Sequence, residues 1–283
     1  MKYFLLLFAL ITTTINAQEI LKFNKRNVEC EDKWVAYEKD NEGAYNFGFI
    51  YFDAQAGLTL NYGGKFKIDE NGKFNLLPSQ KNQTNEYKIR LQPNKIIIAE
   101  IPEEKFKELA IEKTPSWLHI YKGDENSIYR LYRRGFMYNS GNECETALTY
   151  LEKAEKIDAN YKGLQTELAF SYNALGKYDK AENSLKKAIA QNPKDCYTFK
   201  ELAYAYTKQI KLDKAAETYT SMITICGGNN DVAETAHNLA YIYFSNKDKT
   251  NFNKWKLETE KWSKPEDKYR KNLVAMEAEL NKQ

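Results

Sequence analysis

Small and apolar residues recur every 34 positions through the second half of the chain. Small residues occupy two rows, and larger apolar residues occupy most of the others. The rows are Gly135, Ala169 and Ala203; Tyr138, Tyr172 and Tyr206; Ala147, Ala181 and Ala215; Leu151, Leu185 and Tyr219; and Ala154, Ala188 and Met222. This period is typical of stacked helical hairpins, in which small residues allow two helices to cross closely. The pattern predicts about four hairpins over residues 128–263.

The second copy resembles the tetratricopeptide repeat family. It carries Leu168-Ala169, Tyr172, Gly176-Lys177-Tyr178, Ala181, Leu185, Ala188 and Pro193 at the positions typical of that family. The third copy has Ile210 instead of the turn glycine, and the first has Arg134 where leucine is usual. A fourth copy starts about three residues late, at Leu239-Ala240. The family is a scaffold, so the resemblance implies protein binding without identifying a partner.

The resemblance also implies a binding groove lined by the first helix of each hairpin. Its residues here are Phe136, Asn139, Phe170, Asn173, Tyr204, Thr207, Lys208 and Tyr241. Residues three apart on a helix share a face, so the aromatic row and the amide row run side by side. The rings can pack on apolar side chains of an extended peptide, and the amides can pair with its backbone. The alternative is that the rings are packing residues between helices. Tyr132 and Phe136 replace the cationic residues of a carboxylate-clamping groove, which favours a more apolar ligand.

Residues 18–116 follow a strand-like pattern. Residues 45–52 and 58–62 are rich in aromatic and β-branched residues, and 65–68 and 73–76 flank an Asn71-Gly72 turn. Residues 86–91 and 95–99 suggest a second hairpin around Pro93-Asn94, and Pro102 begins a short helix. We expect a small antiparallel sheet with one short helix, followed by a junction over residues 117–127.

The two ends of the chain have their own patterns. Met1-Lys2, an apolar run and a small residue at Ala17 are typical of an export signal over residues 1–17, cleaved after Ala17. After cleavage no remaining stretch is long and apolar enough to span a membrane. Residues 264–283 start with Pro265 and two acids, as helices often do, and alternate apolar with charged residues. We expect a helix that caps the repeats. The sequence thus predicts an α+β chain, with a small antiparallel β-rich N-terminal domain, an all-α helical-hairpin solenoid and a C-terminal capping helix.

Export makes the four cysteines candidates for disulfides. In the repeat register Cys196 begins the first helix of the third hairpin, and Cys226 ends the second helix of the same hairpin. Because the two helices are antiparallel, these two ends lie close together. By elimination Cys30 would pair with Cys144. The alternative is that some of these cysteines are unpaired buried residues.

Little in the sequence suggests catalysis. The two histidines, His119 and His237, are far apart, and the common zinc, redox and serine-hydrolase motifs are missing. We therefore expect no cofactor, no metal and no enzymatic activity. Mixed Lys and Glu, with a formal net charge of +3, give no basic face for nucleic acid.

The favoured function is an exported scaffold that binds a protein or peptide partner in the cell envelope. Aromatic residues make up 14% of the chain. One alternative is therefore a glycan-binding protein that uses the aromatic-rich N-terminal domain. The other is a hydrolase with paired carboxylates in that domain. The missing motifs do not rule out such an enzyme, because two catalytic acids leave no local sequence motif.

Overall fold

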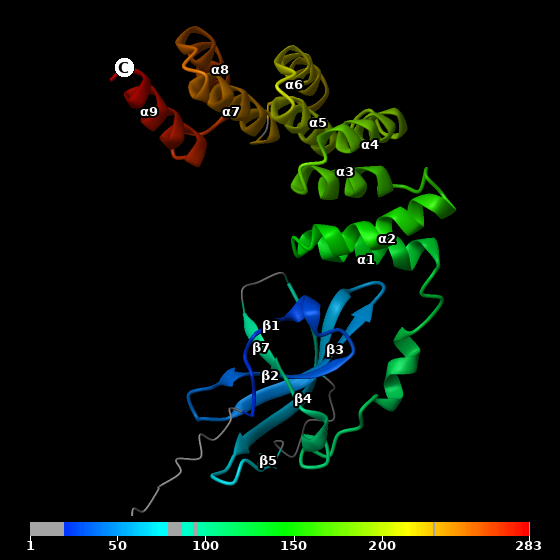
Figure 1. Ribbon diagram of the computed structural model, residues 1–283. Coiled ribbons are helices and arrows are strands. Elements are labelled where there is room, and N and C mark those ends of the chain that lie inside the picture. The colour runs from blue at the N-terminus through cyan, green and yellow to red at the C-terminus, as the bar shows by residue number, and fades with distance from the viewer. Residues whose placement is uncertain (1–19, 79–86, 93–95, 229, 283) are drawn as a thin grey trace, which may run out of the picture. The chain divides into compact units, whose positions relative to one another are not determined.

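The computed structural model describes residues 20–78, 87–92, 96–228 and 230–282. The chain divides into two units, which we call the sheet unit (up to Tyr121) and the helical unit (from Lys122). An antiparallel β-sheet is followed by an array of helical hairpins, which confirms the predicted fold class (Figure 1). The expected export signal, residues 1–17, lies outside the described residues.

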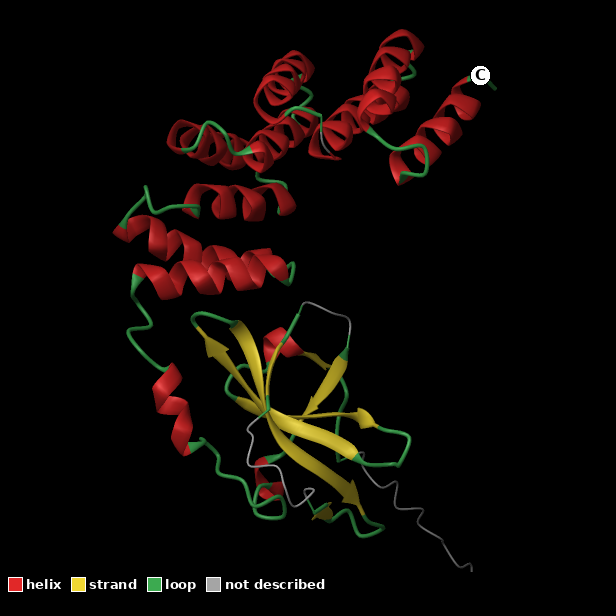
Figure 2. Cartoon of the chain, turned by 180° about the vertical axis from the view of Figure 1, so that it is seen from behind, coloured by secondary structure: helices red, strands yellow, loops and turns green. Residues whose placement is uncertain are grey.

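The sheet unit holds seven strands within the described residues. They are β1 (Lys25–Arg26), β2 (Lys33–Lys39), β3 (Tyr45–Asp53), β4 (Gly57–Ile68), β5 (Phe74–Leu76), β6 (Lys88–Arg90) and β7 (Ile97–Glu100). The order is β1-β7-β2-β3-β4-β5, and β6 also pairs with β4. All pairings are antiparallel. The short helical turns η1 (Asn27–Glu29), η2 (Glu103–Lys105) and η3 (Ser116–Tyr121) complete the unit (Figure 2).

Alternating residues of β3 explain why the centre of the sheet is stable. Phe47, Phe49 and Tyr51 point to one face, and each is 1% exposed. Ile50 and Phe52 point to the other face and are equally buried. Because both faces exclude water, the aromatic-rich strand forms the centre of the core.

The structure confirms one of the two predicted hairpins. β4 and β5 flank the Asn71-Gly72 turn, where Gly72 has a φ of +76°. The second expected hairpin is wrong, because β6 pairs with β4 and β7 pairs with β1 and β2. Ile98 and Ala99 of β7 are fully buried, so this strand gains more by entering the sheet between β1 and β2 than by pairing with exposed β6. Residues 93–95 of the expected turn lie outside the described residues. The expected short helix after Pro102 is the 3-10 turn η2.

Within the described residues, the helical unit contains four helical hairpins and a last helix. The hairpins are α1 (Ile128–Ser140) with α2 (Cys144–Ile157), α3 (Leu164–Ala174) with α4 (Tyr178–Gln191), α5 (Cys196–Lys208) with α6 (Leu212–Cys226), and α7 (Asn230–Ser245) with α8 (Lys249–Trp262). The last helix is α9 (Lys268–Leu280). Figure 1 shows the helices following one another as pairs.

The rows of small residues lie where the helices of a hairpin cross. Ala147, Ala181 and Ala215 are fully buried. At Gly135 a Cβ atom would lie only 2.4 Å from Leu151 Cδ2, so the first hairpin requires glycine there. The small-residue rows therefore act as the sequence pattern indicated.

The C-terminal helix contacts both helices of the fourth hairpin. α9 packs against α7 and α8, and it buries Leu273, Met276 and Leu280. It covers apolar surface that the last hairpin would otherwise expose, as expected of a capping helix.

The cysteines correct one expectation and confirm another. Cys196 and Cys226 form a disulfide with a Cα–Cα distance of 5.9 Å. Cys30 and Cys144 are free and buried, so the expected bridge between them is wrong. Cys30 is 0% exposed in the sheet unit and Cys144 is 4% exposed in the helical unit. Each thiol is thus enclosed by the packing of its own unit.

Candidate functional site

The first helices of the hairpins lie next to one another in the helical unit. α3 contacts α1 and α5, and α5 contacts α7. The side of these helices that carries Phe136, Phe170, Tyr204 and Tyr241 is called the first-helix face below. The first three of these rings are half-buried, and Tyr241 is 49% exposed. The predicted aromatic row is therefore accessible in part on every hairpin.

Cationic side chains lie over two rings of the row. The guanidinium of Arg133 is 5.4 Å from the centre of the Phe136 ring. The ammonium of the exposed Lys208 is 5.3 Å from the centre of the Tyr204 ring. Both distances are within the range of cation–π attraction. The face thus offers ring surfaces that a positive charge can approach.

The asparagines of the predicted groove hold neighbouring helices together. Asn139 Nδ2 donates to the Glu167 backbone oxygen at 2.9 Å and to Glu167 Oε2 at 2.8 Å. Asn173 Nδ2 donates to the Glu201 backbone oxygen at 3.1 Å and to Glu201 Oε2 at 2.9 Å. Both asparagines are 4% exposed. Their N–H groups are therefore directed at the next first helix and position its glutamate.

The other two predicted groove residues differ in exposure. Thr207 is 4% exposed, and its hydroxyl donates to the Ala203 carbonyl at 2.7 Å. Lys208 is exposed and lies over Tyr204 as described above. Of these two residues, Lys208 is therefore the one that presents its polar group to solvent.

Glu167 and Glu201 are the functional candidates that the sequence analysis missed. They lie 34 positions apart, so the repeat register contained the signal. Burial raises the pKa of the Glu167 carboxyl despite the Asn139 hydrogen bond, and the charge of Glu201 adds to the effect. Burial likewise raises the pKa of Glu201 against the hydrogen bond from Asn173. Two desolvated carboxylates of like charge thus lie on adjacent helices.

The neighbouring Lys200 is engaged elsewhere. Its ammonium lies 3.3 Å from Asp231 Oδ1 and 3.6 Å from Glu234 Oε2, both on α7. The charge of Lys200 acts to lower the pKa of Glu201, but this effect is smaller than the effect of burial, which raises that pKa.

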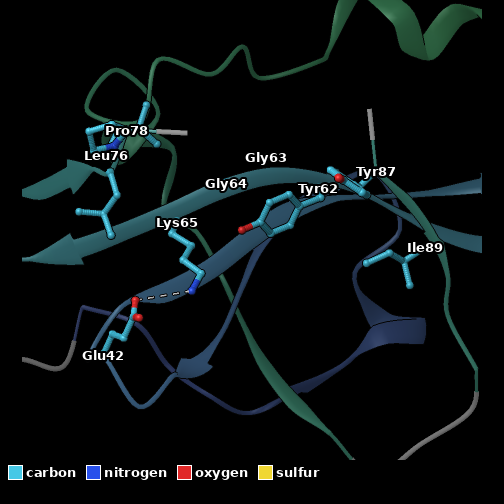
Figure 3. A pocket seen from close by; sticks show the side chains of 10 residues that line it. Glu42, Tyr62, Gly63, Gly64, Lys65, Leu76, Pro78, Tyr87 and Ile89 are labelled. Atoms are coloured by element: carbon cyan, nitrogen blue, oxygen red, sulfur yellow. Dashed lines mark ion pairs between the residues drawn. The ribbon is translucent and has the colours of Figure 1, made fainter. Parts of the chain in front are cut away.

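The sheet unit has a separate cavity of about 640 Å³ at the edge of β4. It is lined by Tyr62, Tyr87, Ile89, Leu76, Leu77, Pro78, Gly63, Gly64, Lys65 and Glu42. Figure 3 shows the Lys65 ammonium pointing toward Glu42, and the two groups are 4.0 Å apart. Lys65 also pairs with Asp40 at 2.6 Å. The cavity combines two tyrosine rings with an ion pair.

Two further properties bear on chemistry. The described part of the chain contains no group of three or more His, Cys, Asp or Glu side chains placed to hold a metal ion. None of the helices described is both long enough and apolar enough to cross a bilayer.

Comparison with known proteins identifies the repeats. Residues 144–203 match the tetratricopeptide repeat family model. The chain is 27% identical over 121 residues to the photosystem I assembly protein Ycf3 of Prochlorococcus marinus strain NATL1A, covering 37% of this chain and 70% of that protein. It is also 41% identical over 56 residues to the TPR repeat-containing protein MJ1428 of Methanocaldococcus jannaschii, covering 20% of this chain and 10% of that one.

Solved structures are similar at low identity. MamA from Desulfovibrio magneticus RS-1 matches with a TM-score of 0.42 and 20% identity, covering 56% of this chain and 86% of that one. A thermophilic TPR protein of Thermus thermophilus, TTC0263, matches with a TM-score of 0.44 and 16% identity, covering 62% and 92%. Together with the hairpins found there, the family match shows tetratricopeptide repeats within residues 144–203. Repeats of this family generally serve as scaffolds for protein–protein interaction.

Proposed function

We propose that this protein is an exported scaffold that holds a peptide segment of a protein partner on its first-helix face. The observation that carries the proposal is the aromatic row. Phe136, Phe170, Tyr204 and Tyr241 recur on neighbouring helices and remain partly exposed. Large rings that a hairpin core does not bury are a favoured contact surface for apolar side chains of a partner.

Export and location are parts of the same proposal. Residues 1–17 have the composition of an export signal. The Cys196–Cys226 disulfide supports an oxidising compartment, since such bonds are rare in the cytosol. The partner is therefore a protein of the cell envelope.

A double substitution tests the binding face. The chain from Gln18 is immobilised and exposed to cell-envelope extract, beside a Phe170→Ala/Tyr204→Ala variant. The matched control is Ile157→Ala/Leu257→Ala, which removes exposed apolar side chains from the second helices α2 and α8. A partner retained by the wild type and the control, and lost by the folded ring variant, is the expected result. Equal retention by all three chains would place the binding surface elsewhere.

A second candidate function follows from the cavity of the sheet unit. Tyr62 and Tyr87 line it, and Tyr87 is 46% exposed. Tyrosine rings with adjacent charged and hydroxyl groups can stack on a sugar ring and hydrogen-bond to its hydroxyls, as a glycan-binding protein requires. Retention of the full chain on envelope polysaccharide, weakened by Tyr87→Ala, would support this function. The lining contains Glu42 as its one described carboxylate, so this cavity offers no carboxylate pair for the hydrolase alternative.

A further inference from the structure

The aromatic row and the two carboxylates lie on the same side of α3 and α5. Glu167 precedes Phe170 by three residues, and Glu201 precedes Tyr204 by three residues. Residues three apart on a helix are neighbours on its surface. Each of these helices therefore presents a carboxylate beside an aromatic ring.

We propose that the peptide bound on the first-helix face carries lysine or arginine side chains, which bind between Glu167 and the Phe170 ring of the second repeat and beside Glu201 of the third repeat, where Lys208 already lies over the Tyr204 ring. This inference rests on the proposed function, because it names the chemistry of the ligand at the same face. The carboxylate supplies an ion pair and the ring supplies a cation–π contact.

The two carboxylates are held in position without a cation. Each accepts a hydrogen bond from an asparagine of the preceding repeat. Throughout the described residues, neither glutamate has a lysine or arginine nitrogen within 4.0 Å. A half-buried carboxylate without a counter-ion destabilises the folded state, because loss of hydration disfavours the charged form of the carboxyl group.

Another buried glutamate shows how the chain treats a carboxylate that has a structural role. Glu182 lies on α4 and is 7% exposed. Lys186 and Lys211 approach it at 2.6 and 2.8 Å. Although burial acts to raise the pKa of Glu182, these two lysines hold it at about 2. Counter-ions are thus provided on the second-helix side, whereas Glu167 and Glu201 have no lysine or arginine nitrogen at such a distance. Glu201 has only the more distant charge of Lys200 and a hydrogen bond from the Tyr197 hydroxyl.

The first repeat shows that a cation fits this arrangement. Arg133 lies 34 positions before Glu167, so it occupies the carboxylate position of its repeat. Its guanidinium lies over the Phe136 ring at 5.4 Å. The equivalent space beside Phe170 has the same ring and a carboxylate in place of the arginine. A guanidinium or ammonium supplied by a ligand can therefore take the place that Arg133 takes in the first repeat.

Three labelled peptides form the probe for this inference. They share one apolar framework and differ at two positions three residues apart, which carry Lys, Leu or Glu. Neighbouring helices pack about 8–10 Å apart. Three residues of a polyproline II peptide, at about 3.1 Å each, span that distance and bring the two side chains back to the same face of the peptide. Fluorescence anisotropy gives the affinity of each peptide for the chain from Gln18.

Two variants with the same change of charge make the test specific. Glu167→Gln/Glu201→Gln keeps an oxygen to accept the asparagine hydrogen bonds and removes both charges. Glu145→Gln/Glu217→Gln removes two exposed carboxylates from the second helices α2 and α6. Circular dichroism verifies that both variants are folded.

We expect the Lys peptide to bind the wild type about tenfold more tightly than the Leu peptide, since hydrogen bonds to charged groups are the stronger ones. That preference should disappear in Glu167→Gln/Glu201→Gln, persist in the control, and shrink in about 0.5 M NaCl because salt screens the charges. Binding of the Lys peptide that is unchanged in Glu167→Gln/Glu201→Gln would overturn the inference.

The same experiment separates the inference from the proposed function. If the Lys and Leu peptides bind equally, and Phe170→Ala/Tyr204→Ala abolishes both, the peptide-binding face stands and its preference for cations is wrong. If the wild type binds none of the three peptides, both the face and its preference are overturned.

Discussion

At the residue scale, the repeats differ in how they satisfy the buried asparagines. Asn139 Oδ1 accepts a hydrogen bond from the Ser171 hydroxyl at 2.6 Å. The equivalent Asn173 Oδ1 is buried with no hydrogen-bond partner among the described residues. The reason is a single atom, because Ala205 stands where the preceding repeat has Ser171. A buried acceptor without a donor destabilises the fold.

Ala205→Ser should restore the missing donor. We expect the helical unit to gain about 1 kcal/mol of unfolding free energy, the usual net effect of one hydrogen bond. Urea denaturation followed by circular dichroism measures the change. In an Asn173→Ala background the gain should vanish, as a double-mutant cycle would show. A serine variant that is no more stable than the wild type would mean that fully buried Ala205 has no room for a hydroxyl.

Glu167 gives a prediction that depends on pH. Because burial raises its pKa in the folded state, the unfolded chain loses this proton first as pH rises. The folded state therefore loses stability between the unfolded pKa, near 4.5, and the higher folded pKa, and the cost is complete above both. Glu167→Gln should raise the melting temperature at pH 7 and have no such advantage below about pH 4. A melting temperature that falls at pH 7 would contradict this account.

The residue scale also shows what a sequence pattern can and cannot predict. The 34-residue period placed Asn139 and Asn173 in one row, and the structure keeps them in equivalent positions. Their partners, Glu167 and Glu201, lie 28 positions further along the chain. Periodicity predicts which residues share a face, but the pairing of side chains between helices depends on the packing of the hairpins.

At the element scale, the turn inside each hairpin uses the same backbone conformation. The residues shortly after the first helices have positive φ: Asn142 (+61°), Gly176 (+70°), Ile210 (+59°) and Lys247 (+58°). Glycine and asparagine adopt this left-handed region readily, whereas a β-branched residue is strained there. Ile210 is also 62% exposed, so burial offsets little of that strain.

Ile210→Gly should therefore stabilise the third hairpin. We expect a gain of about 1 kcal/mol, because relief of roughly 1–2 kcal/mol of backbone strain exceeds the added entropy of an unfolded glycine. Thermal denaturation of the wild type and the variant measures it. Lys247→Gly is the matched comparison and should gain less, since lysine is unbranched at Cβ. If the two glycine variants change stability equally, β-branching does not explain the effect.

Helices were more predictable than strand partners for a physical reason. Each hairpin pairs elements that are adjacent in sequence, such as α5 and α6, so a local pattern fixes both the element and its partner. β7 instead pairs with β2, placing Glu100 opposite Val35. Alternating residues identify a strand, but a partner some 65 positions away depends on how the whole sheet packs. The strand β2 itself was not predicted, although Trp34, Val35 and Ala36 are buried at the centre of the unit.

At the scale of the whole molecule, the chain contains two units with different sources of stability. The sheet unit contains an aromatic cluster in which Trp34 contacts both Phe47 and Phe49, and the cluster excludes water from one face of the sheet. The helical unit repeats one hairpin, and each hairpin contacts the next. In such an array every added constraint on one hairpin supports its neighbours. The disulfide at the ends of the third hairpin is one such constraint.

Removing the disulfide should weaken the helical unit as a whole. Cys196 and Cys226 are 30 positions apart, and closing a loop of this length restricts the unfolded chain by about 3–4 kcal/mol in the chain-entropy model. Cys196→Ser/Cys226→Ser should lower the urea midpoint of the helical signal, and a reducing agent should lower that of the wild type equally. The reducing agent should not affect the double variant, because Cys30 and Cys144 form no bridge. A midpoint that the reducing agent leaves unchanged in the wild type would show that the bridge adds nothing to the stability of the folded array.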